Sequence, residues 1–304
     1  TLRVNNVWVA QDYEVKTINT KRGDVIVGAA PYPVRARLMQ HISGKGMSIR
    51  DVDDQLESEL VRVLQGLAEE ADTLDPDNST PRILTGHFTV RGAILGSERS
   101  VMLGRDVQVS PSLLADSRWD YVALGHIHKH QNLTAGQENM PPVVYSGSLE
   151  CIDFGEEHDN KGYCWLELQR NDVTWKHHPV NARRMKTLRY DCKKDRLPTQ
   201  TIVRDIKKES LKGAIVRLII DLTPETDAVL NDGKIRDALK TAGVFHIASI
   251  RREVERADRA RLGGSPEGLT HEELLERYFI SKDVDEIRRD ELLEAARVII
   301  RGEE

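Results

Sequence analysis

The chain has 304 residues, 39% of them hydrophobic and 31% charged, with a formal net charge of −5. This composition is typical of a globular protein with a substantial core and about two domains. The negative net charge gives no support for nucleic-acid binding but does not exclude it, because only the contact face needs to be positive. No apolar run of membrane-spanning length and no secretory signal is present, so we expect neither a membrane nor a secreted protein. Cys151, Cys164 and Cys192 form no paired motif, which favours a reducing, cytoplasmic location.

The first 180 residues alternate apolar strands with one long helix. The helix is expected over Asp51–Asp72, because apolar residues recur there at spacings of three and four and share one face. The helix itself is either surface or a dimer interface. Apolar runs bounded by polar turns predict strands at Val7–Val9, Val15–Ile18, Val25–Val27, Arg82–Thr85, Tyr121–Leu124, Val143–Tyr145, Gly162–Leu168 and Val173–His177. This order predicts a layered α/β domain over residues 1–180.

A second, smaller domain is predicted over residues 181–256. It opens with a basic run that contains Arg183, Arg184, Lys186 and Arg189. Beyond this run we expect a strand over Ala214–Leu222, a helix over Lys234–Ala242 closed by Gly243, and a strand over Phe245–Arg252. This succession is that of a compact βαβ unit.

The end of the chain is predicted to be a linker followed by two short helices. Charged residues and then Gly, Ser and Pro indicate a linker over 257–267, and a helix-loop-helix follows over 268–304. Thr270 and Glu273 have the spacing of a capping box. Two such helices are too small to fold well alone, so we expect their apolar residues to dock on something else. These residues are Leu274, Leu275, Tyr278, Phe279, Ile287, Leu292 and Leu293.

Three of the predicted strands end in small residues and histidines, namely Gly86-His87, Gly125-His126-Ile127-His128 and Ser146-Gly147-Ser148. Loops at strand ends are where α/β folds place their sites, and neutral imidazole is the commonest metal ligand in proteins. An extended backbone at His126–His128 would point both imidazoles to one side and Ile127 to the core. Glycine before each histidine would let the backbone turn sharply.

A single Gly-His after a strand is most often a turn with a surface histidine, so only the combination of motifs is specific. His130 is interpreted as an exposed neighbour. The other histidines receive structural interpretations; these are His41, His158, His177, His178, His246 and His271.

The combined motifs resemble those of a known superfamily. Gly86-His87, Leu124–His128, Tyr145–Glu150, Phe154–Glu157 and Lys161-Gly162 are similar to the later motifs of calcineurin-like metallophosphoesterases. The run from Tyr145 to Glu157 and the helical tail resemble more closely the SbcD family of double-strand-break repair nucleases. The resemblance implies a partial calcineurin-like metallophosphoesterase sandwich, a small βαβ capping domain and a C-terminal helix-loop-helix.

The resemblance also implies a site with two Mn²⁺ ions. His87 and His126 would bind one ion and His128 the other, and the pair would hold the scissile phosphate and activate water. Ser146 and Ser148 would lie near the phosphate. The family's earlier motifs, Asp-x-His, Gly-Asp-x-x-Asp and Gly-Asn-His-Asp, do not occur in this sequence. Because Mn²⁺ prefers oxygen ligands, we expect the chain alone to bind metal poorly and to be inactive.

The resemblance implies a nuclease subunit with exonuclease and single-strand endonuclease activity, which is nucleoid-associated if the source is prokaryotic. One implied partner is DNA, which Arg183, Arg184, Lys186 and Arg189 would contact unless these cations are solvated surface. The others are an SbcC-type coiled-coil ATPase, which the helical tail would bind, and a second copy of the complete protein. Two alternatives stay open. One is a phosphatase or phosphodiesterase for small or protein substrates, and the other is a non-catalytic ATPase-binding module.

Overall fold

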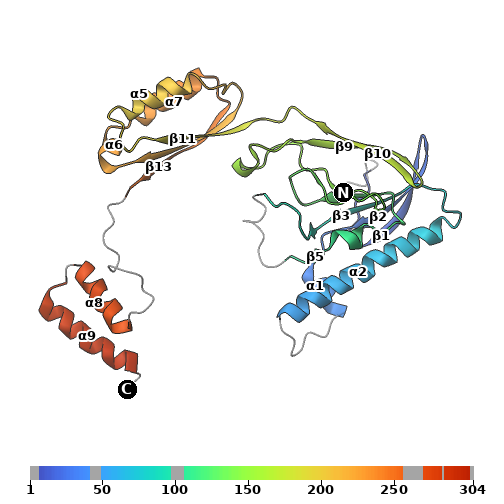
Figure 1. Cartoon of the computed structure of the whole chain (residues 1–304), viewed down its shortest axis with the longest axis horizontal. Helices are drawn as coiled ribbons and strands as arrows, with labels where there is room; N and C mark the ends of the chain where they lie inside the picture. Colours follow the sequence, from blue (N-terminus) through green and yellow to red (C-terminus); the bar gives the residue numbers. More distant parts are fainter. Residues whose placement is uncertain (1–6, 42–48, 97–105, 256–269, 283, 302–304) are drawn as a thin grey trace. The chain divides into compact units, whose positions relative to one another are not determined.

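The computed structural model describes residues 7–41, 49–96, 106–255, 270–282 and 284–301 (Figure 1). The chain divides into two compact units. The first contains residues 1–187, 211–216 and 243–246, and the second contains 188–210, 217–242 and 247–304. The predicted domain limits at 180 and 256 stay predictions, and the predicted linker over 257–267 lies outside the described residues.

A six-stranded mixed sheet forms the centre of the first unit. Its order is β1 (Glu14–Thr20), β2 (Gly23–Ala30), β3 (Arg82–His87), β6 (Tyr121–Gly125), β8 (Val143–Tyr145) and β7 (Gln131–Asn132). β2, β3, β6 and β8 run parallel, while β1 and β7 pair antiparallel at the edges. The carboxyl ends of the central strands therefore meet along one edge, and the predicted α/β class is confirmed.

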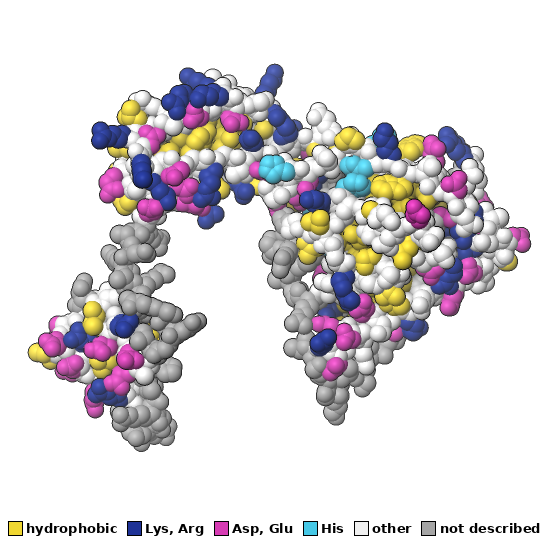
Figure 2. Space-filling view, viewed as in Figure 1, with side chains coloured by type: hydrophobic (Ala, Val, Ile, Leu, Met, Phe, Trp, Pro, Cys, Tyr) yellow, Lys and Arg dark blue, Asp and Glu magenta, His cyan; other side chains and the backbone are white. Residues whose placement is uncertain are grey.

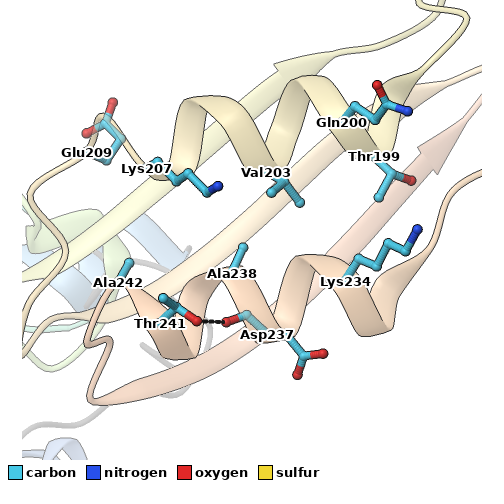
Figure 3. A pocket seen from close by; sticks show the side chains of 10 residues that line it. All are labelled: Thr199, Gln200, Val203, Lys207, Glu209, Lys234, Asp237, Ala238, Thr241 and Ala242. Atoms are coloured by element: carbon cyan, nitrogen blue, oxygen red, sulfur yellow. Dashed lines mark hydrogen bonds between the residues drawn. The ribbon is translucent and has the colours of Figure 1, made fainter.

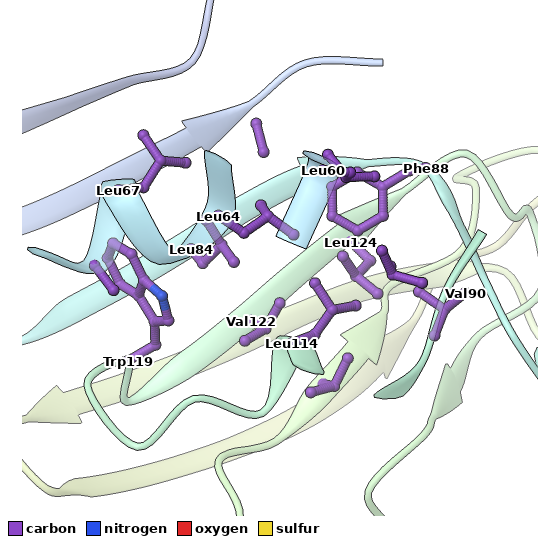
Figure 4. Packing of buried hydrophobic residues seen from close by; sticks show 14 of the residues in the cluster. Leu60, Leu64, Leu67, Leu84, Phe88, Val90, Leu114, Trp119, Val122 and Leu124 are labelled. Carbon is purple, nitrogen blue, oxygen red and sulfur yellow. The ribbon is translucent and has the colours of Figure 1, made fainter. Parts of the chain in front are cut away.

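One face of this sheet is covered by α2 (Ile49–Leu74), the helix expected at Asp51–Asp72 (Figure 1). Its apolar face is buried at Leu56, Leu60, Leu64, Leu67 and Ala71. These side chains join sheet residues such as Leu84, Val122 and Leu124 in one core cluster (Figure 4). The apolar face of α2 is therefore part of the core, and a role of the helix in a dimer stays a prediction. The short α1 (Arg35–Leu38) and η2 (Met39–His41) precede α2.

The other face carries an antiparallel hairpin, β9 (Gly162–Gln169) and β10 (Asp172–Pro179). Residues alternate along β6, so Val122 faces α2 while Tyr121 faces the hairpin, where its ring lies 6.1 Å from that of Trp175. Helix, sheet and hairpin thus form three layers. The specific calcineurin-like sandwich stays a prediction. Smaller elements complete the unit; these are β4 (Thr89–Val90), β5 (Gln108–Val109), α4 (Pro111–Leu114) and η3 (Phe154–Glu156).

The strand predicted at Val7–Val9 is wrong, because these residues have no secondary structure. Val7 and Val9 are exposed and pair with no neighbouring strand. The Trp8 indole instead donates a hydrogen bond to Glu14 at 3.1 Å. An apolar run becomes a strand only where a partner strand satisfies its backbone.

A three-stranded sheet, most of it in the second unit, has the order β11 (Met185–Asp191), β12 (Ile215–Leu222) and β13 (His246–Val254). The helices of the second unit are α5 (Pro198–Ile206), α6 (Pro224–Ala228) and α7 (Asp232–Thr241). The predicted βαβ unit is therefore preceded by one more strand and helix. β11 was hidden in the basic run, because the exposed Lys186, Arg189 and Asp191 are interspersed among its less exposed residues. Gly243 has φ +76, as its predicted role at the end of α7 requires.

The C-terminal helices are α8 (His271–Ser281) and α9 (Glu286–Arg301), which pack against each other. The predicted capping box is confirmed, since Thr270 Oγ1 accepts from the Glu273 amide at 3.2 Å and the Glu273 carboxylate accepts from the Thr270 amide at 2.7 Å. Arg297 of α9 forms an ion pair with Glu272 of α8. No helix among the described residues is both long and apolar enough to cross a membrane.

Candidate functional site

His87 and His126 lie together at the carboxyl edge of the sheet. His87 is the last residue of β3 and pairs in register with Gly125, the last residue of the adjacent parallel strand β6. The two imidazole rings are 5.1 Å apart between centroids, with their planes at 67°. The sheet thus brings together two of the three histidines that the sequence singled out.

The glycines before these histidines serve close packing rather than a turn, which corrects the sequence interpretation. A Cβ at Gly86 would lie 2.6 Å from Phe88 Cε1, and one at Gly125 would lie 3.0 Å from His87 Nδ1. The turn occurs at His126 itself, whose φ is +95. The backbone is therefore not extended throughout His126–His128, although Ile127 is buried as expected.

Asp106 contacts His126 and was not identified from the sequence. Its carboxylate lies 3.2 Å from His126 Nε2 and accepts hydrogen bonds from the Tyr32 hydroxyl at 2.6 Å and the Thr89 hydroxyl at 2.9 Å. Burial alone would raise the pKa of Asp106, but the bonds from Tyr32, Thr89 and His126 bring it below its ordinary value. Asp106 is therefore an anion. In the sequence it is an acidic residue just before Val107 and the two-residue strand β5, which is no specific signal.

Tyr32 lies beside both imidazoles, with ring centroids 5.8 Å from His126 and 6.3 Å from His87. Burial and the hydrogen bond to Asp106 raise the pKa of Tyr32 to about 12, so its hydroxyl stays protonated and donates to Asp106. Nothing in the sequence connected Tyr32 to the histidines, because it precedes them by a whole helix.

His128 contacts a different carboxylate. Its Nδ1 is 2.8 Å from Glu156 Oε1, and Glu156 Oε2 accepts from Lys161 Nζ at 2.7 Å. Burial works to raise the pKa of Glu156, but hydrogen bonds from Lys161, the Ile152 amide and His128 lower it below its ordinary value. Glu156 and Lys161 belong to the motifs that carried the resemblance, but the sequence assigned no role to them.

The Ser146–Ser148 loop supports the histidine segment. Gly147 has φ +79, and a Cβ there would lie 2.8 Å from the His128 carbonyl oxygen. The Ser148 amide donates to that same carbonyl at 3.1 Å. The Ser146 and Ser148 hydroxyls donate to the carbonyls of Gly147 and Glu150. Both hydroxyls thus have backbone acceptors, and their contact with DNA stays a prediction.

His130 is not the exposed neighbour that we expected. Its ring stacks on that of His177 with centroids 3.9 Å apart, and its Nδ1 lies 2.9 Å from the Tyr145 carbonyl oxygen. The segment after His128 therefore returns to β8 and buries His130 in part, so this ring contributes to packing.

Histidines and carboxylates are chemically suitable ligands for a divalent metal ion, but too few of them come together here to complete a site. Burial, followed by the neighbouring charges of His126 and His128, lowers the pKa of His87, which favours the neutral imidazole that metals require. In the part of the chain that the structure describes, no group of three or more His, Cys, Asp or Glu side chains could hold a metal ion. Oxygen ligands beyond these residues are needed for Mn²⁺.

The four predicted DNA-contacting cations have different surroundings. Arg183 and Arg184 line a cleft of about 280 Å³ together with Lys212 and Glu150. The Arg183 guanidinium stacks on Phe245, 3.7 Å from the ring centroid. The sequence did not identify Lys212, which lies far from the basic run along the chain.

Lys186 and Arg189 lie on β11. Arg189 forms ion pairs with Asp221 at 2.8 Å and Glu253 at 2.9 Å, so carboxylates of its own sheet already neutralise it. In the view of Figure 2, basic and acidic side chains are interspersed over the described surface of each unit. The basic run is thus not a uniform basic surface.

The hollow between α5 and α7, about 670 Å³, is larger than the arginine cleft but contains no histidine (Figure 3). Val203 of α5 and Ala238 of α7 point toward each other across it, whereas Lys207, Lys234 and Asp237 give its lining charge. None of the histidines that the sequence singled out lines this hollow.

The predicted docking residues of α8 and α9 differ in exposure. Tyr278 is 49% exposed and Ile287 is 77% exposed, whereas Leu293 is 7% exposed. The half-buried members are Leu274, Leu275, Phe279 and Leu292. Ile287 and Tyr278 are thus available to a partner, while Leu293 packs within the helical pair.

The comparisons with known proteins agree with the motif resemblance. No protein-family model matches the chain. The chain is 33% identical over 98 residues to the SbcD component of the SbcCD nuclease of Staphylococcus epidermidis, which covers 32% of this chain and 24% of that protein. It is 33% identical over 109 residues to the same component from Staphylococcus saprophyticus, which covers 36% of this chain and 27% of that protein. The similarity thus spans about a quarter of these curated relatives, and the predicted resemblance to SbcD-type nucleases is confirmed at this level.

Proposed function

We propose that this chain contributes the histidine half of a two-metal phosphodiesterase centre in the nuclease subunit of a DNA double-strand-break repair complex. The main observation behind this proposal is that the imidazole rings of His87 and His126, with centroids 5.1 Å apart, lie at the ends of two adjacent parallel strands. The similarity to the SbcD components of two SbcCD nucleases supports the same class. The activity would be Mn²⁺-dependent hydrolysis of DNA, from ends and within single strands.

His87 and His126 would bind one Mn²⁺ ion and His128 the other, with further oxygen ligands completing the set. When bound, the metal pair would hold the scissile phosphate and supply an activated water. Asp106 contacts His126 at Nε2, so the ring presents Nδ1 on its opposite side. Tyr32 covers both rings and holds Asp106 in place.

DNA would be gripped beside the cleft that Arg183, Arg184 and Lys212 line. These three cations outnumber the one carboxylate there, Glu150, so a phosphate would be attracted. Replacing Lys212 by Ala is expected to weaken binding equally for all DNA sequences. It should also reduce the slope of log affinity against log salt by about one.

The α8–α9 pair would dock on the coiled-coil base of an SbcC-type ATPase, since Tyr278 and Ile287 expose apolar surface. Deleting residues 268–304 should abolish binding of the purified ATPase. Undiminished binding would contradict the docking proposal while leaving the metal site untouched. We also expect a cytoplasmic, nucleoid-associated protein that dimerises when complete.

The decisive experiment compares His87→Ala and His126→Ala with His158→Ala in the full-length protein. Linear duplex DNA and single-stranded circles are incubated with Mn²⁺, and cleavage is followed by gel. The first two changes should lower the rate on the order of 100-fold or more, because each removes a metal ligand. His158, with a side chain 88% exposed, provides the matched control. Retained cleavage after either ligand change would contradict the assignment.

A non-catalytic ATPase-binding module is the second candidate. The observation that favours it is the lack of a three-ligand metal group among the described residues. It predicts ATPase binding without any Mn²⁺-dependent cleavage in the full-length protein.

A general phosphatase or phosphodiesterase is tested in the same assay. Cleavage of a small phosphodiester, bis-p-nitrophenyl phosphate, used beside DNA would reveal such an activity.

A further inference from the structure

Two segments that lie far apart in the sequence, 211–216 and 243–246, meet beside the arginine cleft of the first unit. The Gly213 amide donates to the Gly243 carbonyl at 2.8 Å, and the Phe245 amide donates to the Ala214 carbonyl at 2.9 Å. The stem of Lys212 lies against Gly243, where an added Cβ would be 3.5 Å from Lys212 Cγ. These contacts bring Lys212 and Phe245 to the same side of the cleft.

The side chain of Arg183 joins the two segments. Its Nη1 donates to the Gly213 carbonyl at 3.1 Å, and its guanidinium stacks on the Phe245 ring, 3.7 Å from the centroid. Glu150 accepts from the backbone amide of Arg183, and no carboxylate among the described residues forms an ion pair with the guanidinium. The positive charge is thus held on the face of an aromatic ring and is available to an anion.

Phe245 is 62% exposed although the guanidinium covers one face of its ring. A single exposed apolar side chain needs no explanation by itself. Phe245, however, adjoins a cleft that three cations and one carboxylate line. Proteins that bind single-stranded nucleic acid combine these two features, because the bases stack on aromatic rings and the phosphates follow the cations.

The size of the cleft and the geometry of DNA narrow the choice of ligand. The cleft has a volume of about 280 Å³. Sites for whole small molecules usually measure about 300 to 1,000 Å³, so this cleft suits one unit of a longer chain. In a duplex each base is already stacked between its neighbours, whereas an unpaired base offers its face to a protein ring.

We propose that Phe245, with Arg183 on one face, is a stacking platform for one unpaired base of single-stranded DNA, while Arg183 and Lys212 contact the adjacent phosphates. The inference deepens the proposed function and rests on it only for DNA as the ligand. It adds a contact with a base to the phosphate contacts of the cleft, so this surface prefers single strands to duplex. A cation–π pair without a ligand would make binding independent of the bases.

Phe245→Leu tests the proposal, because leucine keeps an apolar side chain but removes the flat ring. The full-length protein, without metal so that nothing is cleaved, is titrated into a labelled oligothymidylate of about 12 nucleotides. Fluorescence anisotropy should show binding weakened by about 5- to 150-fold, the loss typical of one base–aromatic contact. An abasic chain of the same length keeps every phosphate, and its affinity should not change. Unchanged affinity for the oligothymidylate would overturn the proposal.

Two further variants control for the loss of an aromatic ring as such. Phe245→Tyr keeps the ring and should retain the parent affinity for the oligothymidylate. Trp165→Leu removes a ring that is 56% exposed on β9 and does not line the cleft, so both affinities should stay unchanged. Equal losses for Trp165→Leu and Phe245→Leu would contradict a platform at Phe245. Thermal unfolding should be close to that of the parent in every variant, since these side chains are exposed.

Lys212→Ala separates this inference from the proposed function. It removes a phosphate contact and should weaken the binding of the oligothymidylate, the abasic chain and a duplex alike. If Lys212→Ala weakens all three and Phe245→Leu weakens none, the proposed grip on DNA stands and the stacking platform is wrong. If neither change affects any of the ligands, both are wrong. Because no metal is present in these titrations, the outcome does not depend on the proposed Mn²⁺ site.

Discussion

The Tyr145 hydroxyl donates a hydrogen bond to the Phe88 carbonyl, 2.6 Å away, and accepts one from the Val90 amide at 3.0 Å. All three residues are buried. Phe88 directly follows His87, and Tyr145 ends β8, which is separated from β3 by β6. Burial raises the pKa of Tyr145 well above its ordinary range, so the hydroxyl remains a donor. One side chain therefore fixes the segment that follows His87.

Tyr145→Phe should lower the free energy of unfolding by about 1 to 3 kcal/mol, because the Phe88 carbonyl and the Val90 amide lose their partner in the core. Urea denaturation followed by circular dichroism measures the change. Tyr163→Phe is the matched control, since Tyr163 is 45% exposed on β9, and its effect should stay within about 0.5 kcal/mol. An unchanged unfolding midpoint for Tyr145→Phe would contradict the role of the hydroxyl.

Most of the fold follows from periodicity. The α2 face from Leu56 to Ala71 recurs at helical spacing, and its residues are the buried ones. The run Val143–Tyr145 coincides with a strand. Val7–Val9 has the same local pattern but no neighbouring strand, and strand pairing is a long-range property. β11 was missed for a different reason, since Lys186 points to one face of the strand and Arg189 and Asp191 to the other, so the sequence shows no simple alternation.

The part of the candidate site that lies at strand ends could be predicted from the sequence. Gly-His motifs after apolar strands placed His87 and His126 at one edge of the sheet, because the ends of parallel strands meet there. Asp106 and Tyr32 reach these rings from loops whose positions depend on the whole fold. Local motifs do not encode such contacts. The same holds for the contact of His128 with the buried Glu156.

The backbone of His126 has φ +95, a conformation that costs a non-glycine residue on the order of 1 to 3 kcal/mol. His126→Gly should therefore be more stable than His126→Ala by about 1 kcal/mol, although both lose the imidazole and its bond to Asp106. Chemical denaturation of the two variants measures the difference. At His178, in β10, the order should reverse, because glycine weakens a regular strand. Equal stability of the two His126 variants would argue against backbone strain there.

Asp75, just after α2, accepts hydrogen bonds from the Thr80 amide at 3.0 Å and the Arg82 guanidinium at 3.2 Å. Burial opposes ionisation, but the bonds from Thr80, Ser79 and Arg82 lower the pKa of Asp75 from 3.8 to about 2. Its pKa is lower in the folded state than in the unfolded state. The carboxylate therefore stabilises the fold fully above pH 3.8, and this stabilisation is lost as pH falls toward 2.

Asp75→Asn should accordingly destabilise the protein by about 1 to 3 kcal/mol at neutral pH. The difference from the parent should shrink as pH falls from about 4 toward 2, as denaturation at stepped pH values would show. Asp77, exposed in the next turn, provides the control Asp77→Asn, which should change little at any pH. A difference that stays constant down to pH 2 would mean that Asp75 acts through its shape and not its charge.

Ile287 and Leu293 of α9 separate partner binding from folding, because Ile287 is 77% exposed and Leu293 is 7% exposed. Ile287→Glu should leave the unfolding free energy within about 0.5 kcal/mol of the parent. If the helical pair docks on an ATPase, the same change should weaken that binding by about 2 kcal/mol, because it places a charge in an apolar contact.

Leu293→Ala should instead lower the free energy of unfolding by about 2 kcal/mol or more, through the cavity it leaves between α8 and α9. Calorimetric titration with the purified ATPase and thermal unfolding of both variants distinguish the roles. Full binding by Ile287→Glu would place the docking surface on other residues of the chain.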